Sequence, residues 1–477
     1  MASTPCAEGI EAIMFRTIGD GPSVWESLLP AEVLRLPDEL ARVDALLDDP
    51  VFFAPFAPFF HPVLGRPSTP VECYLRLMFL KFRYRLGYES LCAEVSDSIS
   101  WRRFCRIPLD GRVPHPTTLM KLTTRCGEGA VAGLNEALWA KASAAKLLRT
   151  ARVRADTTVI SANVAYPTDS GLLAKAVGKL VRTARRVQAA GGAPGAVMTD
   201  RRRAAARRVR EIAAKLRSRS KLGREETTAA IRRVTGELAD LALKTAAQAA
   251  AVLRNGRRAV PKALSGRMRG RLRRALGELA VTIERTGVIV AQARTRLGGQ
   301  TPDGATRLVS LHDPDARPIR KGRIDRPVEF GYKAQVTDND DGVILDYTVE
   351  FGAAPDGPQL APAIERIARR AGRVPRAVTA DRGYGRAAYE RDLHELGVRT
   401  VAVPRQGKIS AARKQIEHSR GFHRLVKWRT GSEGRISYLK RGYGWDRTRL
   451  DTRHGAAIWC GHGVFAHNLV KIAALAS

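Results

Sequence analysis

Apolar and polar residues recur with two different periods along this chain, and each period predicts a different kind of element. Between residues 68 and 126, apolar positions return at helical spacing in stretches interrupted by Gly, Asp and Pro, which predicts several short helices. The segment RVRADTTVI at 152–160 is rich in β-branched residues and predicts a strand. At 51–67 Phe alternates with Pro, which cannot continue a helix, so we expect an extended segment there.

The second half of the chain alternates between strand and helix patterns. The predicted strands, including one hairpin, lie at 306–313, 328–351, 376–381 and 398–405. The turn of the hairpin is formed by Asp340, Asp341 and Gly342. Amphipathic helices are predicted at 357–372 and 386–397. Strands that alternate with helices in this way indicate an α/β fold with a mixed sheet.

Residues 171–300 differ from the rest of the chain in composition. Their pattern is helical throughout, and 31 Lys and Arg stand against only 8 Asp and Glu, so this stretch holds +23 of the net charge of +34. A solvated helical face more often mixes both signs. We therefore interpret the stretch as a basic α-helical insertion that lies on DNA. A basic arm that is only exposed to solvent is the alternative.

The net charge also limits the kinds of partner. A strongly basic chain predicts a polyanion, because neutralised phosphates release their counterions. No apolar run approaches the ~20 residues of a membrane-spanning helix, and the N-terminus lacks the basic start and apolar stretch of a signal peptide. The six cysteines are scattered without a CxxC pair, which is typical of reduced thiols. We expect a cytoplasmic, nucleoid-associated protein whose partner is double-stranded DNA and which has no membrane partner.

Arginines on the predicted N-terminal helices suggest where DNA is read. These are Arg83, Arg85, Arg102, Arg103 and Arg106. Short helices that carry cations resemble a helix-turn-helix type of DNA reader, although a plain helical bundle with solvated arginines explains the same pattern. We interpret residues 1–150 as an N-terminal helical domain that binds DNA.

Three carboxylates on three different elements are the candidate catalytic residues. Asp156 lies within the first predicted strand, Asp381 ends a later one, and Glu433 lies between Arg429 and Lys440 in WRTGSEGRISYLK. On a helix, positions four and seven apart share one face, so both cations would flank Glu433. An Asp in the middle of a strand opposes strand propensity and therefore needs a reason.

These carboxylates fit a divalent-metal site that acts on phosphates. Mg²⁺ and Mn²⁺ prefer carboxylate oxygens, and two such ions activate the attacking oxygen and stabilise the leaving oxygen of a phosphodiester. Each acid alone has an ordinary explanation, since Asp381 suits a turn and Glu433 suits a surface ion pair. Their joint occurrence beside cations favours the metal site.

The same segments resemble the DDE transposases of bacterial insertion sequences, in the broad IS4/IS5 group and closest to the IS1182-like elements. DTTVISANVAYPTDSGLL at 156–173 is similar to the segment around their first aspartate, and ADRGYG at 380–385 is similar to that around the second. Arg429, Glu433 and Lys440 match three of the four positions of their Y-xx-R-xxx-E-xxxxxx-K signature.

This resemblance implies an RNase H-like catalytic core and metal-dependent DNA strand cleavage and strand transfer at terminal inverted repeats. It implies that Asp156, Asp381 and Glu433 ligate Mg²⁺ or Mn²⁺, with two ions in the site. Arg429 and Lys440 would hold DNA phosphates, the arginine through its planar fork and the lysine as a point charge. A homodimer is expected, because two DNA ends must be brought together.

The resemblance covers most of the chain outside the insertion and departs from the family at two places. Val426 occupies the tyrosine position of the signature, so Tyr438 or Tyr443 would have to supply any role of that tyrosine. The DDE catalytic domain, 151–477, is interrupted at about 171–300, between the first two aspartates.

Two other functions use the same residues. One is a catalytically inactive, transposase-derived protein that only binds DNA, and the other is a nuclease of the same fold without strand transfer. The presence of all three acids favours an enzyme, because an acid beside a phosphate weakens simple binding.

Overall fold

The computed structural model describes residues 15–18, 26–65, 67–217, 223–262, 265–320 and 327–476. Its contacts divide the chain into two units, which we describe separately. The first unit joins residues 1–162 to 332–477, and the second is 163–331. The segment with the basic composition therefore forms a unit of its own.

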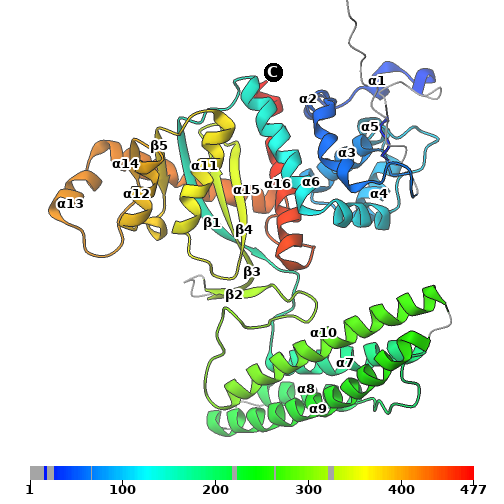
Figure 1. Ribbon diagram of the computed structural model, residues 1–477. Helices are drawn as coiled ribbons and strands as arrows, with labels where there is room; N and C mark the ends of the chain where they lie inside the picture. The colour runs from blue at the N-terminus through cyan, green and yellow to red at the C-terminus, as the bar shows by residue number, and fades with distance from the viewer. Residues whose placement is uncertain are drawn as a thin grey trace, which may run out of the picture. The chain divides into compact units, whose positions relative to one another are not determined.

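A mixed sheet has β1 (Arg152–Ser161) at its centre (Figure 1). The strand order is β2-β3-β1-β5-β6, and β4 also pairs with β3. β5 is parallel to both β1 and β6, whereas β3 is antiparallel to β2 and β4. The other strands are β2 (Arg317–Arg320), β3 (Val328–Asp338), β4 (Ile344–Phe351), β5 (Ala377–Ala380) and β6 (Thr400–Ala402). This sheet and its helices confirm the predicted mixed α/β class.

Helices that follow the sheet strands pack on them with their apolar residues. α11 (Leu360–Ala371) lies on β4 and buries a stripe at helical spacing, from Leu360 through Ile364 to Ile367. Gly372 ends this helix at φ 66°, a left-handed conformation that suits glycine. α15 packs on β1 and α14 on β5. The bounds are α12 (Ala387–Glu395), α13 (Ala411–Glu417), α14 (Arg420–Arg429) and α15 (Gly431–Gly442).

The N-terminal helices pack directly on the same unit through α16 (Thr452–Leu475). α16 contacts α2, α3, α6 and β4, and most of its residues are buried. Trp139 of α6 donates a hydrogen bond to the carbonyl of Ile344 at the start of β4 (2.7 Å). The helices are α1 (Ala31–Leu34), α2 (Asp38–Leu47), α3 (Val71–Arg83), α4 (Tyr88–Asp97), α5 (Ile99–Phe104) and α6 (Pro116–Ala144). The helical part before β1 is thus attached to the sheet by buried contacts.

Two local predictions were wrong. The Phe/Pro segment at 51–67 is not simply extended, because it contains the 3₁₀ helices η2 (Pro50–Phe52) and η3 (Ala54–Phe59). Proline is tolerated in the first turn of such helices, where its missing N–H would have no partner. Residues 306–313 do not form a strand. Leu308 and Leu311 are instead buried against the helices of the second unit, which satisfies the apolar run without strand pairing.

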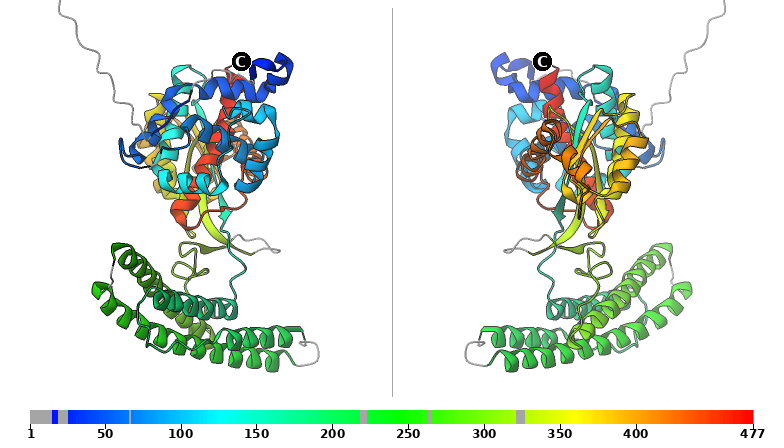
Figure 2. Two further views of the ribbon diagram at one scale, coloured as in Figure 1. Left: turned by 90° about the vertical axis from the view of Figure 1, so that its right-hand side faces the viewer. Right: turned by 90° about the vertical axis from the view of Figure 1, so that its left-hand side faces the viewer.

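The second unit consists mainly of four helices that pack side by side (Figure 2). They are α7 (Asp169–Ala189), α8 (Arg202–Arg217), α9 (Arg224–Ala259) and α10 (Gly266–Leu297). Two apolar clusters of Ala, Leu, Val and Ile hold them together. In the described part of the chain, no helix is long and apolar enough to cross a membrane.

Candidate active site

The register of two central strands places the first two predicted carboxylates side by side. In the parallel pair of β1 and β5, Ala155 lies opposite Ala380. The residues that follow them are Asp156 within β1 and Asp381 directly after β5. Neighbouring strands are roughly 4.8 Å apart, so the two aspartates begin from adjacent positions at the end of β5.

Asp156 is held in surroundings that disfavour its charge. It is 8% exposed, and its Oδ1 accepts a hydrogen bond from the backbone N–H of Thr157 (2.8 Å). The pKa of Asp156 is raised to about 6, mainly by burial; the carboxylates of Asp381 and Glu433 contribute to the rise, whereas the N–H of Thr157 and the charge of Arg429 oppose it. The three predicted carboxylates therefore lie close enough to interact electrostatically.

Arg429 links the first and third carboxylates. Its guanidinium lies 3.4 Å from Asp156 Oδ2 and 3.5 Å from Glu433 Oε1. The two residues do not share one helix as predicted, because α14 ends at Arg429 and α15 begins at Gly431. Thr430 keeps a backbone near the helical region (φ −56°, ψ −23°), so the four-residue spacing still brings Arg429 and Glu433 together.

Lys440 lies further from this cluster. It is half-buried in the last turn of α15, seven residues or about 10 Å along the helix from Glu433. Its charge acts on the buried thiol of Cys460 in α16, whose pKa is raised by burial and lowered by Lys440. The structure thus unites Arg429 with the carboxylates and places Lys440 at the edge of the site.

The oxygen donors of this cluster fit a hard divalent cation, but the side chains do not yet surround one common position. The cluster offers carboxylate oxygens, and a cation would relieve the charge that buried Asp156 bears beside Asp381. Among the described residues, no three His, Cys, Asp or Glu side chains already stand close enough to hold a metal ion. The Glu433 side chain is 69% exposed, so it has room to turn from Arg429 towards Asp156.

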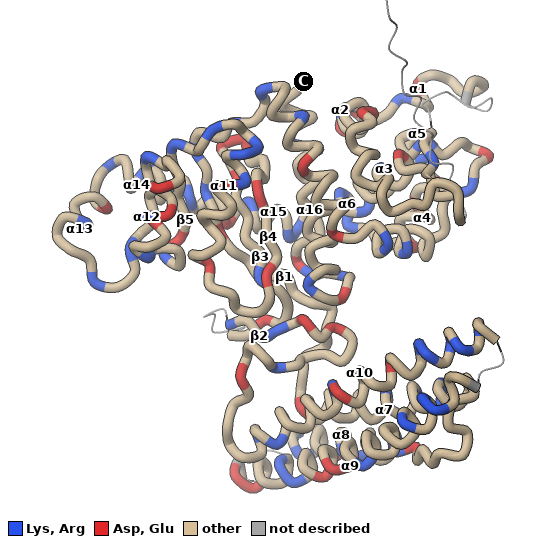
Figure 3. Tube along the Cα trace, in the orientation of Figure 1, with Lys and Arg blue, Asp and Glu red and all other residues tan. Residues whose placement is uncertain are grey.

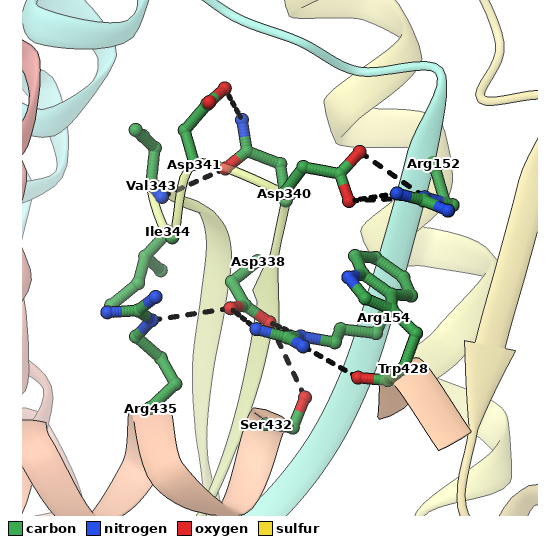
Figure 4. A network of polar contacts seen from close by, with 12 residues as sticks. Arg152, Arg154, Asp338, Asp340, Asp341, Val343, Ile344, Trp428, Ser432 and Arg435 are labelled. Carbon is green, nitrogen blue, oxygen red and sulfur yellow. Dashed lines mark hydrogen bonds and ion pairs between the residues drawn. The ribbon is translucent and has the colours of Figure 1, made fainter. Parts of the chain in front are cut away.

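A buried ionic network fixes the start of α15 to the sheet (Figure 4). Arg154 of β1 forms two hydrogen bonds with Asp338 of β3 (2.9 and 2.8 Å) and donates to the carbonyl of Trp428 in α14 (2.7 Å). Ser432 and Arg435 of α15 also reach Asp338 (3.4 and 3.3 Å). These contacts hold the helix junction that carries the predicted arginine and glutamate over the strand that carries the first aspartate.

Sequence reasoning missed Tyr384, which lies close enough to both aspartates to interact with them electrostatically. Its hydroxyl is buried and donates to Gln335 Oε1 of β3 (3.1 Å). Burial raises the pKa of Tyr384, and the nearby carboxylates of Asp356, Asp156 and Asp381 add to the rise. The sequence feature that could have identified this tyrosine is its place in ADRGYG, three residues after the second aspartate.

An apolar side chain fills the tyrosine position of the signature. Val426 is partly buried against an apolar cluster that includes Phe422 and Leu425. Tyr438 and Tyr443, the predicted replacements, pack edge to face with ring centroids 5.6 Å apart. Tyr443 is fully buried and belongs to the core of the unit.

Four of the five arginines predicted to read DNA make contacts within the protein instead. The ion pairs are Arg83 with Glu39, Arg85 with Asp446 and Arg106 with Asp48. Arg102 donates to the carbonyls of Ser96, Pro108 and Gly111. These side chains stabilise the helical bundle, which favours the alternative explanation for them.

Comparisons with known proteins match two parts of the chain. Residues 29–125 match the family described as "Transposase domain (DUF772)", and residues 308–469 match the "Transposase DDE domain". The second match contains Asp381 and Glu433. An uncharacterized protein of Rhizobium meliloti, ORF8 in the nfe locus, is 31% identical over 160 residues, which cover 31% of this chain and 73% of that protein. No solved structure matches.

Proposed function

Because the chain belongs to the DDE transposases of insertion sequences, we propose that it cleaves DNA strands at the terminal inverted repeats of its element and transfers them to target DNA. The observation that supports this proposal best is the pairing of Ala155 with Ala380, since it puts Asp156 and Asp381 on adjacent strands. Arg429 connects the first of them to Glu433.

Asp156, Asp381 and Glu433 are the proposed ligands of two Mg²⁺ or Mn²⁺ ions. When bound, such ions activate the attacking oxygen and neutralise charge on the reacting phosphate. Glu433 would join the other two by leaving Nη2 of Arg429, which would then be available to a DNA phosphate while Nη1 stays near Asp156. Lys440 supplies a further positive charge for the same strand.

The strand arrangement supports an RNase H-like catalytic core. A central strand carries the first aspartate, antiparallel strands lie on one side of it and parallel strands on the other. The helices of the second unit form the proposed insertion within this core, and the helices before β1 form the proposed DNA-binding domain. Synapsis of two DNA ends calls for a homodimer.

Cleavage of labelled DNA that carries the ends of the element tests this proposal. With Mg²⁺ or Mn²⁺, we expect wild-type protein to nick the duplex and Glu433→Gln to lose cleavage while it retains binding. Glu395→Gln, which changes an exposed glutamate of α12, is the matched control and should cleave normally. Unchanged cleavage by Glu433→Gln would exclude Glu433 from the site.

A further inference from the structure

A groove in the N-terminal part of the first unit is lined by cations. It encloses about 850 Å³ between the segment before α3, the loop before α6 and the first turns of α6. Arg16, Arg112, Lys121 and Arg125 line it, and none of its described lining residues is Asp or Glu. Arg125 also covers the ring of Phe60 on the wall (4.7 Å to the centroid). Such a groove attracts an anionic partner.

One face of the first part of α6 forms a wall of this groove. Leu119, Leu122 and Cys126 are buried beneath it, whereas Thr118, Lys121 and Arg125 are exposed. The three exposed residues follow helical spacing and therefore lie on one face. Gly127, at φ 67°, interrupts the helix after this face, so the segment 116–126 is a straight rod about 16 Å long.

We propose that this face of α6, from Thr118 to Arg125, reads double-stranded DNA at the ends of the element, with Arg16 and Arg112 on the flanking phosphates. The inference rests on the proposed transposase function. The charge of the groove favours duplex DNA as the partner. The described lining residues include several cations and no acid, and duplex DNA carries closely spaced phosphates. The helix is also long enough to span a major groove about 12 Å wide.

The side chains on this face suit both parts of DNA recognition. Lys121 and Arg125 supply charge for phosphates or guanine edges, and Thr118 supplies a hydroxyl and a methyl group for base edges. Arg83 of α3 and Arg106, which follows α5, do not compete for this role, since acids of the bundle engage them.

Selection of random duplexes by the full-length protein in EDTA tests the proposal without any cleavage step. Wild type should enrich a motif that also occurs at the element's ends. Lys121→Ala/Arg125→Ala should bind at least tenfold more weakly, with a salt slope reduced by about two, because two phosphates would no longer be neutralised. Thr118→Ala should change the enriched motif with little effect on the slope.

The matched control is Arg35→Ala/Arg42→Ala, which also removes two exposed arginines but away from the groove. It should keep the motif and most of the affinity. Equal motif, affinity and slope in wild type and Lys121→Ala/Arg125→Ala would overturn the inference, while cleavage of element ends in Mn²⁺ would still support the proposed function. If the wild-type protein selected the motif but cleaved no DNA in any condition, the proposed function would be rejected, while DNA recognition by this face of α6 would still be supported. Thr118→Ala and Arg35→Ala/Arg42→Ala should show wild-type thermal denaturation, because the altered side chains are exposed. Lys121→Ala/Arg125→Ala should unfold in one transition at a slightly lower temperature, because Arg125 covers the ring of Phe60.

Discussion

Asp156 shows how a single residue can be unfavourable for stability and suited to a reaction. The strand buries it, and the only oppositely charged partner at its carboxylate in the described residues is Arg429, 3.4 Å away. Its raised pKa measures how poorly the protein alone compensates this charge. A residue in such a position is a candidate for function, since stability would favour an uncharged side chain.

The raised pKa predicts how stability depends on pH. Between the ordinary value of 3.8 and about 6, the folded chain binds more protons at Asp156 than the unfolded chain. The free energy of unfolding should therefore fall as the pH rises through this window. At neutral pH without metal, Asp156→Asn should be more stable than wild type by roughly 2 kcal/mol.

Thermal denaturation at pH 5 and pH 7.5 would measure this effect, with Asp392→Asn on exposed α12 as the control. Mn²⁺ should raise the melting temperature of wild type and leave that of Asp156→Asn unchanged. A variant that is less stable than wild type at neutral pH would show that the carboxylate is well compensated.

At the residue scale, the sequence was informative where chemistry and spacing coincided. Asp156, Asp381, Arg429 and Glu433 were predicted as a group, and their electrostatic proximity agrees with that expectation. Tyr384 could not be singled out, because its proximity to the aspartates depends on how the turn after β5 folds beneath the sheet.

At the scale of elements, the junction of α14 and α15 decides where Glu433 stands. Gly431 opens α15 directly beside Arg154, and a Cβ added at Gly431 would lie 2.3 Å from Nη1 of that arginine. Arg154 cannot move freely, because Asp338 and the Trp428 carbonyl hold its guanidinium. A glycine is therefore needed for the helix to approach the sheet this closely.

Gly431→Ala should lower the free energy of unfolding by about 1–3 kcal/mol, as overpacking does, and should reduce cleavage. The matched control is Gly434→Ala, three residues along the same helix, where an added Cβ meets nothing within 4 Å. This control should gain about 0.5–1 kcal/mol, since alanine favours the helix. Equal stability of the two variants in chemical denaturation would contradict the close approach.

The elements themselves were predictable to different extents. The strand with Asp156, the hairpin at Asp340–Gly342 and the helix that ends at Gly372 follow from local patterns that the fold preserves. The close approach of Gly431 to Arg154 could not be seen in the sequence, because the two residues are more than two hundred positions apart.

At the scale of the whole molecule, the basic charge is concentrated within the second unit. Residues 241–277 contain ten Lys and Arg and no acid, and the cations of α10 gather in its first half (Figure 3). The acids of the other helices are mostly in ion pairs, for example Glu237 with Arg233 and Asp240 with Arg294. Residues 241–277 are thus the longest stretch of this unit without an acid.

Neutralising the cations at the start of α10 should weaken DNA binding without affecting sequence preference. Arg267→Gln/Arg269→Gln/Arg271→Gln should lower the salt slope of binding by up to about three. The control is Arg233→Gln/Arg294→Gln, which changes arginines already paired with acids and should alter the slope less. An unchanged slope for the triple variant would indicate that the insertion does not contact DNA.

The central claim, that the three carboxylates bind the metal, is tested most directly by the metal dependence of Asp381→Cys. A thiolate is a poor ligand for Mg²⁺ and a better one for the softer Mn²⁺. We therefore expect Asp381→Cys to lose cleavage in Mg²⁺ and to regain part of it in Mn²⁺, whereas Asp392→Cys should cleave in both. Equal cleavage by Asp381→Cys and wild type in Mg²⁺ would contradict the proposed metal site.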